Sequence, residues 1–245
     1  ATGLSVGVIG LGTVKFGRNA GVKYPKAFEL PTDAEIDGLL AVAEEEGVNL
    51  IDTAPAYGSS EERIGRAIAG RRDRWVVATK VGERFEGGVS SFDFSPSAVR
   101  ESVEASLRRL RLECVDVVLV HSDGEVEHSP AFEEAVRTLC DLKRAGKLRA
   151  TGASTKSVEG GLRAVEMVDV VMVTLNEAER ADEVVIRAAE RSGVGVLIKK
   201  AFASGHRASA DGLALIASTP GVSSIVIGTI NPHNLRSNCR AVHAI

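Results

Sequence analysis

The feature that most constrains the fold of this chain is an alternation of short apolar runs with amphipathic helical patterns along its 245 residues. Most of the runs are continuously rich in Val, Ile and Leu, as is typical of strands buried on both faces of a parallel sheet. The predicted strands are residues 5–10, 48–52, 75–80, 115–121, 148–153, 168–174, 195–199 and 224–228. Eight strands that alternate with helices in about 250 residues predict an α/β fold, the (β/α)8 TIM barrel. No linker divides the chain, so we expect a single barrel domain over residues 1–245.

Capping signals mark where several of the intervening helices begin. Thr32-Asp33-Ala34-Glu35 matches a capping box, and Ser95-Pro96 places a cap before a first-turn proline. Asn231-Pro232 begins the last predicted helix. The helical pattern is weakest over residues 199–224, where glycines interrupt it.

Composition excludes several classes of partner. The net charge is −3 and no basic run occurs, which argues against nucleic acid or an anionic membrane surface. No apolar run is long enough to span a bilayer, and residues 1–12 lack the pattern of a signal peptide. The three cysteines, Cys114, Cys140 and Cys239, have no metal-like spacing. We therefore expect free thiols in a reducing compartment, the cytoplasm. We also expect the protein to be a monomer.

Four ionisable side chains stand at or just after the ends of the second, third and fourth predicted strands. They are Asp52, Tyr57, Lys80 and His121. Each alone has an ordinary structural explanation, but the active sites of such barrels lie at the carboxyl ends of the strands. A free phenol has a pKa of about 10, and a nearby ammonium lowers it. The set therefore predicts a proton donor suited to protonating a carbonyl oxygen while a hydride reaches the carbon.

These four residues lie in segments that resemble the aldo-keto reductase superfamily. The similarity is strongest in Asp52–Gly58, Ala78–Lys80 and Val117–His121. It continues through residues 10–13, 143–147, 152–154 and 227–232, and so covers nearly the whole chain. The resemblance implies an NAD(P)H-dependent enzyme that reduces small aldehydes or ketones to alcohols by hydride transfer. It also implies that Tyr57 is the general acid, that Lys80 and Asp52 tune it, and that His121 orients the substrate.

The same resemblance assigns residues to the nicotinamide end of a cofactor. Ser154 and Thr155 would face the carboxamide, and Asn176 falls in the sixth-strand segment near the ring. Met172 stands where the family commonly has Gln, which changes the expected surface beside the ring. The cofactor that the resemblance implies is NADP(H), with NAD(H) as the alternative.

The adenosine end of the cofactor is assigned to the segment after the last predicted strand. Gly228, Thr229, Asn231 and Asn238 would hold it, and the helix that begins at Pro232 offers N–H groups to an anion. Gly228 and Asn234 fall where many members of the family carry the Lys and Arg that grip a 2′-phosphate. We therefore predict only a modest preference for NADP(H) over NAD(H).

Five aromatic residues on the predicted loops are candidates to line a pocket for a small or polar carbonyl substrate. They are Phe16, Tyr24, Phe28, Phe85 and Phe94. Each has an equally simple role as an anchor that holds its loop.

Three other interpretations compete with a reductase. A dinucleotide fingerprint Gly-x-Gly-x-x-Gly beginning at Gly10 needs glycine at position 15, which is Lys15. A metal hydrolase could use His121, Asp123, Glu125 and His128, but their spacing matches no ligand motif, and we predict no metal site. The alternative that stays open is a cofactor-sensing binding module of the same fold with little turnover.

Overall fold

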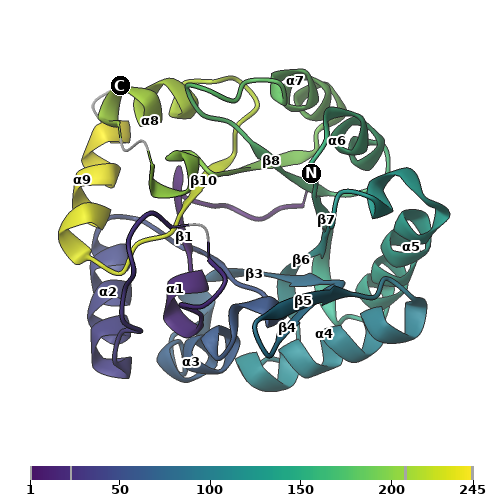
Figure 1. Ribbon diagram of the computed structural model, residues 1–245, viewed down its shortest axis with the longest axis horizontal. Coiled ribbons are helices and arrows are strands. Elements are labelled where there is room, and N and C mark those ends of the chain that lie inside the picture. Colours follow the sequence, from purple (N-terminus) through teal and green to yellow (C-terminus); the bar gives the residue numbers. More distant parts are fainter. Residues whose placement is uncertain (1, 23, 207–208, 244–245) are drawn as a thin grey trace.

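The computed structural model describes residues 2–22, 24–206 and 209–243. Its barrel strands are β1 (Ile9–Gly12), β2 (Leu50–Asp52), β3 (Val76–Val81), β6 (Val115–His121), β7 (Leu148–Ser154), β8 (Val170–Thr174), β9 (Gly195–Lys199) and β10 (Ser224–Ile227). These eight strands are parallel and close into a barrel in the order β1-β10-β9-β8-β7-β6-β3-β2 (Figure 1). The predicted (β/α)8 barrel is confirmed, with most strand boundaries within two residues of those expected.

Helices surround the barrel. The α-helices are α1 (Val14–Gly17), α2 (Asp33–Glu45), α3 (Ser60–Ala67), α4 (Pro96–Leu110), α5 (Pro130–Arg144), α6 (Val158–Val165), α7 (Glu183–Ser192), α8 (Ala210–Ala217) and α9 (Pro232–His243). Short 3₁₀ turns are η1 (Pro55–Tyr57), η2 (Arg72–Arg74), η3 (Val126–His128) and η4 (Ala203–Gly205). The capping box of Thr32 and Glu35 forms as predicted, and the Ser95 side chain caps α4. No helix in the described ranges is long and apolar enough to cross a membrane.

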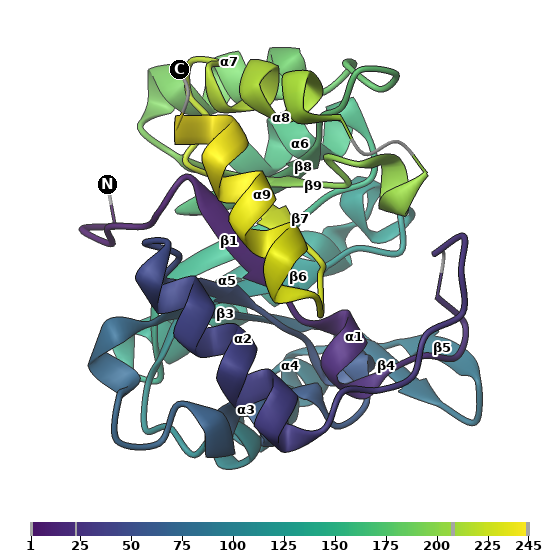
Figure 2. The same ribbon diagram turned by 90° about the vertical axis from the view of Figure 1, so that its left-hand side faces the viewer.

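The first strand begins later than the sequence predicted, at Ile9 rather than Ser5. The backbone before it is bound by a side chain instead of a neighbouring strand, because Gly7 N donates to Asn49 Oδ1 at 2.8 Å and Asn49 Nδ2 donates to the Ser5 carbonyl at 2.9 Å. Leu4 and Val6 pack against the residues that fill the barrel interior. The apolar pattern here therefore closes one end of the barrel, the end at which Figure 2 places the N-terminus.

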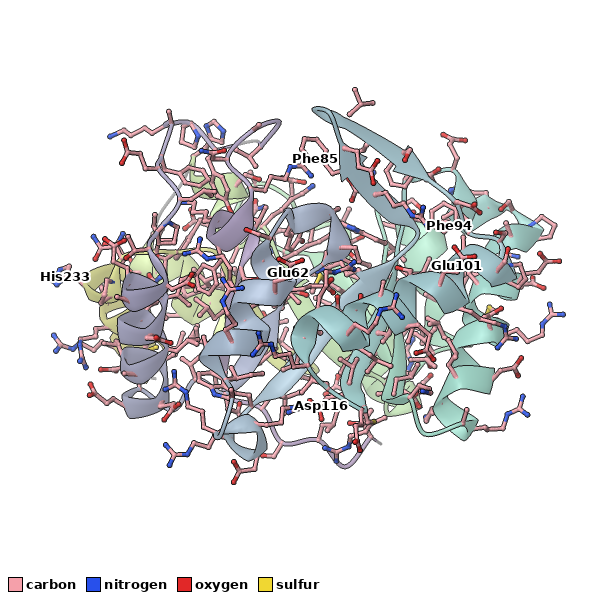
Figure 3. The ribbon with its side chains drawn as sticks, turned by 90° about the horizontal axis from the view of Figure 1, so that it is seen from below. Glu62, Phe85, Phe94, Glu101, Asp116 and His233 are labelled. Carbon is pink, nitrogen blue, oxygen red and sulfur yellow. The ribbon has the colours of Figure 1, made fainter. Side chains whose placement is uncertain are left out.

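The opposite end of the barrel carries a hairpin, in a segment that was predicted to be a loop. Strands β4 (Glu83–Glu86) and β5 (Val89–Phe92) are antiparallel and are joined by Gly87 and Gly88, which have φ of 58° and 88°. A Gly-Gly pair between two short strands is a hairpin signal, since both turn positions need positive φ. In Figure 3 the hairpin carries Phe85 at one end of the molecule, while Asp116 lies at the other.

Helices α3 and α4 pack closely at two buried positions of α3. Glu61 receives hydrogen bonds from Thr79 Oγ1 at 2.6 Å and from Arg109 Nε at 2.7 Å. One turn later Gly65 lies so close to α4 that a Cβ atom there would stand 2.5 Å from the Arg109 carbonyl oxygen. The helix before β3 is thus tied to both the barrel and the next helix.

Two glycine-to-alanine substitutions should change stability in opposite directions. Gly65→Ala forces backbone atoms of α4 to move and should destabilise the fold by about 1–3 kcal/mol. Gly38→Ala, on an open face of α2 with no atom near the new methyl group, should stabilise it by about 0.4–1 kcal/mol. Urea unfolding of both variants measures the difference. Equal effects would show that the close α3–α4 contact does not constrain the fold.

Candidate active site

Three neighbouring strands place their terminal polar side chains at one edge of the barrel. Asp52 ends β2 and Lys80 lies near the end of the adjacent β3. Lys80 Nζ donates to Asp52 Oδ1 at 2.7 Å and to the Thr53 carbonyl at 2.8 Å. Lys80 is 1% exposed and Asp52 is 4% exposed, so this is a buried ion pair with a further neutral acceptor.

Tyr57 and His121 complete a cluster with this ion pair. Tyr57 ends η1, and Lys80 Nζ lies 4.8 Å from the centroid of its ring. His121 ends β6 and meets Tyr57 edge to face, with ring centroids 6.3 Å apart. The structure therefore brings together the four side chains that the sequence placed at strand ends.

A chain of buried hydroxyl groups fixes the segment after β2. Thr13 Oγ1 donates to the Asp52 carbonyl at 2.9 Å, and Ser60 Oγ donates to the Thr13 carbonyl at 2.9 Å. Thr53 Oγ1 in turn donates to Ser60 Oγ at 3.1 Å. Because these bonds join the ends of β1 and β2 to the start of α3, the turn that carries Tyr57 is held at both sides.

The protonation states of Lys80 and Tyr57 follow from burial and from each other's charge. Burial would lower the pKa of Lys80, but Asp52 and Tyr57 raise it above its ordinary value. Burial raises the pKa of the Tyr57 phenol, and the Lys80 ammonium opposes this rise without reversing it. The expected net lowering of the phenol pKa is therefore wrong for this structure. At neutral pH the phenol keeps its proton, which is the form that a proton donor requires.

His121 has a carboxylate partner that sequence reasoning missed. His121 Nδ1 lies 2.8 Å from Glu83 Oε2, a close polar contact in which the two atoms are not aligned for a regular hydrogen bond. Burial lowers the pKa of His121, which Glu83 partly offsets, and the ring is neutral at pH 7. Burial would raise the pKa of Glu83, but His121, Ser90 and Arg18 lower it to about 2. The glycine pair of the β4–β5 hairpin is the signal that could have located Glu83.

Residues predicted for the nicotinamide end surround an unexpected lysine. Lys199, the last residue of β9, donates to Ser154 Oγ at 3.0 Å and to the Thr155 carbonyl at 2.5 Å. The Thr155 hydroxyl is buried, has no hydrogen-bond partner among the described residues, and lies on the side of Gly161 in α6. Thr155 thus presents its carbonyl, rather than its hydroxyl, to Lys199.

Asn176 uses its side chain within its own loop. Its Oδ1 accepts from the N–H groups of Ala178 and Glu179 at 3.0 and 2.9 Å, and its Nδ2 donates to the Lys200 carbonyl at 3.1 Å. The structure therefore does not direct the amide of Asn176 toward Ser154. Met172 is buried in the barrel interior.

The segment predicted to hold the adenosine end is partly capped by its own side chains. Asn231 Oδ1 accepts from His233 N at 2.9 Å and from Asn234 N at 3.4 Å, while Asn231 N donates to Thr229 Oγ1 at 3.1 Å. Two of the first N–H groups of α9 are therefore already bonded, which reduces what the helix offers an anion. Asn238 lies half-buried further along α9.

The cations and the glycine near this segment have other neighbours. Arg236 pairs with Glu45 at 2.6 Å and with Glu46 at 2.7 Å, both on or next to α2, so its guanidinium does not reach the start of α9. At Gly228 a Cβ atom would stand 2.7 Å from the Tyr24 hydroxyl. The loop that carries Tyr24 therefore reaches across to the end of β10.

The predicted lining aromatics divide into two groups. Phe16 and Phe94 are buried and anchor their loops. Tyr24 meets Phe28 edge to face at 5.6 Å, with Lys15 Nζ 4.1 Å from the Tyr24 ring centroid. Figure 3 labels Phe85 on the hairpin, where the Arg18 guanidinium lies 3.3 Å from its ring centroid. We call the end of the barrel at which the strands terminate the barrel mouth. Loops from two sides of this mouth therefore meet through a cation–aromatic contact.

Comparison with known proteins identifies the family. The model of the aldo/keto reductase family matches residues 8–212. The chain belongs to the aldo/keto reductase family. A solved structure from Pseudomonas aeruginosa that bears the same family name is 46% identical, has a TM-score of 0.89, and is matched over 99% of this chain and 92% of that one.

Curated members of the family match smaller parts of this aldo/keto reductase chain. Aldo-keto reductase YhdN of Bacillus subtilis is 34% identical over 188 residues, which are 74% of this chain and 54% of that protein. The NADH-specific methylglyoxal reductase of Escherichia coli is 38% identical over 121 residues, which are 44% of this chain and 37% of that protein. The chain thus spans about half, or less, of the length of these relatives. Within the described residues no group of three or more His, Cys, Asp or Glu side chains is arranged for a metal ion.

The contact between Glu83 and His121 predicts how the imidazole titrates. Glu83→Gln removes the carboxylate that raises the pKa of His121, so that pKa should fall further below its ordinary value. An NMR pH titration of the imidazole, assigned with His121→Gln, measures the change. Glu86→Gln, an exposed position on the same hairpin, is the control and should leave the titration unchanged. An identical His121 titration in both variants would contradict the coupling.

Proposed function

We propose that this protein is an oxidoreductase that uses NAD(P)H to reduce small aldehydes or ketones to alcohols, with Tyr57 as the proton donor. The observation that carries the proposal is the buried Lys80–Asp52 ion pair beside a Tyr57 phenol that retains its proton. Membership of the aldo/keto reductase family supports the use of a nicotinamide cofactor.

Each residue of the cluster has a separate role in carbonyl reduction. When bound, the reduced nicotinamide supplies the hydride that adds to the carbonyl carbon. Tyr57 donates its proton to the carbonyl oxygen, and Lys80 stabilises the phenolate that this leaves. The ammonium interacts more strongly with phenolate than with phenol. It therefore lowers the free energy of the proton-transfer step more than that of the resting state. Asp52 keeps Lys80 charged, and the neutral His121 orients the carbonyl group beside Tyr57.

The residues near the end of β7 fit the carboxamide of such a cofactor. The Lys199 ammonium has three N–H bonds and uses two of them, on Ser154 and on the Thr155 carbonyl. The remaining N–H of Lys199 and the hydroxyl of Ser154 can each donate a hydrogen bond to a carboxamide oxygen. Lys199 and Ser154 would thus hold the carboxamide.

Removing the phenol hydroxyl tests the proton donor. Tyr57→Phe should lower turnover by about 10²–10⁴ while cofactor binding and folding stay close to normal, because only the acid is lost. Lys80→Met should be as severe, since it removes the cation that stabilises phenolate. Ser218→Ala, which removes an exposed hydroxyl at the C-terminal end of α8, is the control and should leave turnover unchanged.

The measurement is steady-state oxidation of NADPH and NADH with a panel of carbonyls that includes nitrobenzaldehydes. Normal turnover in Tyr57→Phe would refute the assignment of the acid. If no carbonyl is reduced although cofactor binds, the alternative of a cofactor-sensing binding module with little turnover is correct.

The start of α9 predicts a modest preference for NADP(H). Asn231 caps two of the first N–H groups, and Arg236 is held by Glu45 and Glu46. Asn234→Arg adds a cation at an exposed first-turn position and should raise the NADPH preference, because a hydrogen bond between charged groups contributes about 1.5–3 kcal/mol. Dissociation constants for NADPH and NADH measure it, and Ser237→Arg, exposed one turn later, is the control. A wild-type preference of about a thousandfold or more, which corresponds to about 4 kcal/mol, would mean that another cation binds the phosphate.

A further inference from the structure

Lys199 is a cation in the barrel mouth whose hydrogen-bond partners are neutral. Its ammonium is held by the Ser154 hydroxyl and the Thr155 carbonyl. Among the described residues no carboxylate lies within 4.0 Å of it, in contrast to Lys80, which Asp52 neutralises. Moving an ammonium away from water costs free energy unless other groups compensate it. Two neutral acceptors compensate only part of that cost.

The strand register places Lys199 at the level of the cluster. Lys199 is the terminal residue of β9 and pairs with Thr174 on β8, while Ser154 on β7 pairs with His121 on β6. The side chain of Lys199 therefore crosses β8 to reach Ser154, inside the ring of strand ends. Its charge is also one of the causes that lower the pKa of His121.

Several charged groups face this ammonium from the surrounding elements. Burial lowers the pKa of Lys199 to about 7, so it exchanges its proton near neutral pH. The other charged groups that act on it are Lys200, Glu127 before α5, Asp182 before α7, and Lys80 on β3. The carboxylates of Glu127 and Asp182 already accept hydrogen bonds from backbone N–H groups, that of Lys156 after β7 and that of Thr174 at the end of β8.

We propose that Lys199 makes the pocket distinguish the redox state of the nicotinamide, by favouring the neutral reduced ring over the positively charged oxidised ring. The inference rests on the proposed function, because Lys199 and Ser154 are the residues proposed to hold the carboxamide. Reduced and oxidised cofactors carry the same phosphates and adenosine, so the ratio of their affinities isolates the charge of the ring. A cation fixed beside the carboxamide repels only the oxidised form.

Binding measurements test the proposal without turnover. Isothermal titration gives dissociation constants for NADPH and NADP⁺, or for NADH and NAD⁺ if these bind more tightly. Lys199→Met should strengthen binding of the oxidised form relative to the reduced form by about a hundredfold, the scale of the interaction between two unit charges about 6 Å apart at an effective dielectric constant of about 20. Lys199→Arg retains the charge and should keep most of the wild-type ratio.

The matched control is a lysine at the opposite end of the barrel. Lys147→Met is the same substitution directly before β7, away from the strand ends that carry Lys199, and it should leave the ratio unchanged. Thermal unfolding without cofactor shows whether each variant is folded. Lys199→Met removes a partly buried charge whose hydrogen-bond partners are neutral, and it should not lower the melting temperature.

The pH dependence provides a second readout. In the wild type the preference for the reduced form should be larger at pH 6 than at pH 8.5, because Lys199 is charged below its pKa of about 7. In Lys199→Met this dependence should disappear. A pH dependence of unchanged size in Lys199→Met would overturn the inference, because Lys199 would then not be the group that titrates.

Each outcome has a distinct meaning. An unchanged ratio in Lys199→Met, or an equal loss of both affinities as expected for a lysine that binds the pyrophosphate, overturns the inference and leaves the proposed function standing. Failure of the wild type to bind either redox form overturns both.

Discussion

The buried ion pair between Lys80 and Asp52 is the interaction on which the rest of the site depends. Two charges removed from water are tolerated only where geometry is good and the remaining donors are satisfied. Here one ammonium proton goes to Asp52 and another to the Thr53 carbonyl. Because β2 and β3 are adjacent parallel strands, barrel closure itself sets the distance between the two side chains. The hydroxyl groups of Thr13 and Ser60 then fix the turn that brings Tyr57 to the ammonium.

Burial and charge act on Tyr57 in opposite directions, and their balance decides its form. Burial raises the pKa of the phenol more than Lys80 lowers it, so the resting side chain is protonated. In the proposed reaction the ammonium is most effective after the proton has left Tyr57, when it faces a phenolate. A strand-end lysine exposed to solvent would be screened by water and would lose this effect. The depth of Lys80 in the barrel is therefore as important as its distance from Tyr57.

The sequence predicted those features that depend on local pattern. Alternating apolar runs located the strands, and Thr32 and Ser95 located helix starts, because capping needs only residues a few positions apart. The start of β1 was misplaced since Leu4 and Val6 are apolar for a different reason, packing at the end of the barrel. Glu83 was missed because its contact with His121 depends on where a hairpin folds. Asn231 was predicted to meet a cofactor, and only the structure shows that its side chain also caps α9.

The two lysines at the barrel mouth show why position along the chain does not determine what a charge can do. Both end or nearly end a strand, but Lys80 is fully buried whereas Lys199 is partly exposed. Lys80 meets a carboxylate, which raises its pKa and keeps its charge constant over the physiological range. Lys199 meets a hydroxyl and a carbonyl, and its pKa falls to about 7. A carboxylate beside Lys199 would have fixed its charge but cancelled its field. Because its partners are neutral, the Lys199 ammonium can repel a positively charged ligand. The same neutral partners do not hold its proton, so Lys199 deprotonates near neutral pH. One barrel end therefore holds a permanent cation beside the proposed proton donor and a titratable cation beside the residues proposed to bind the nicotinamide.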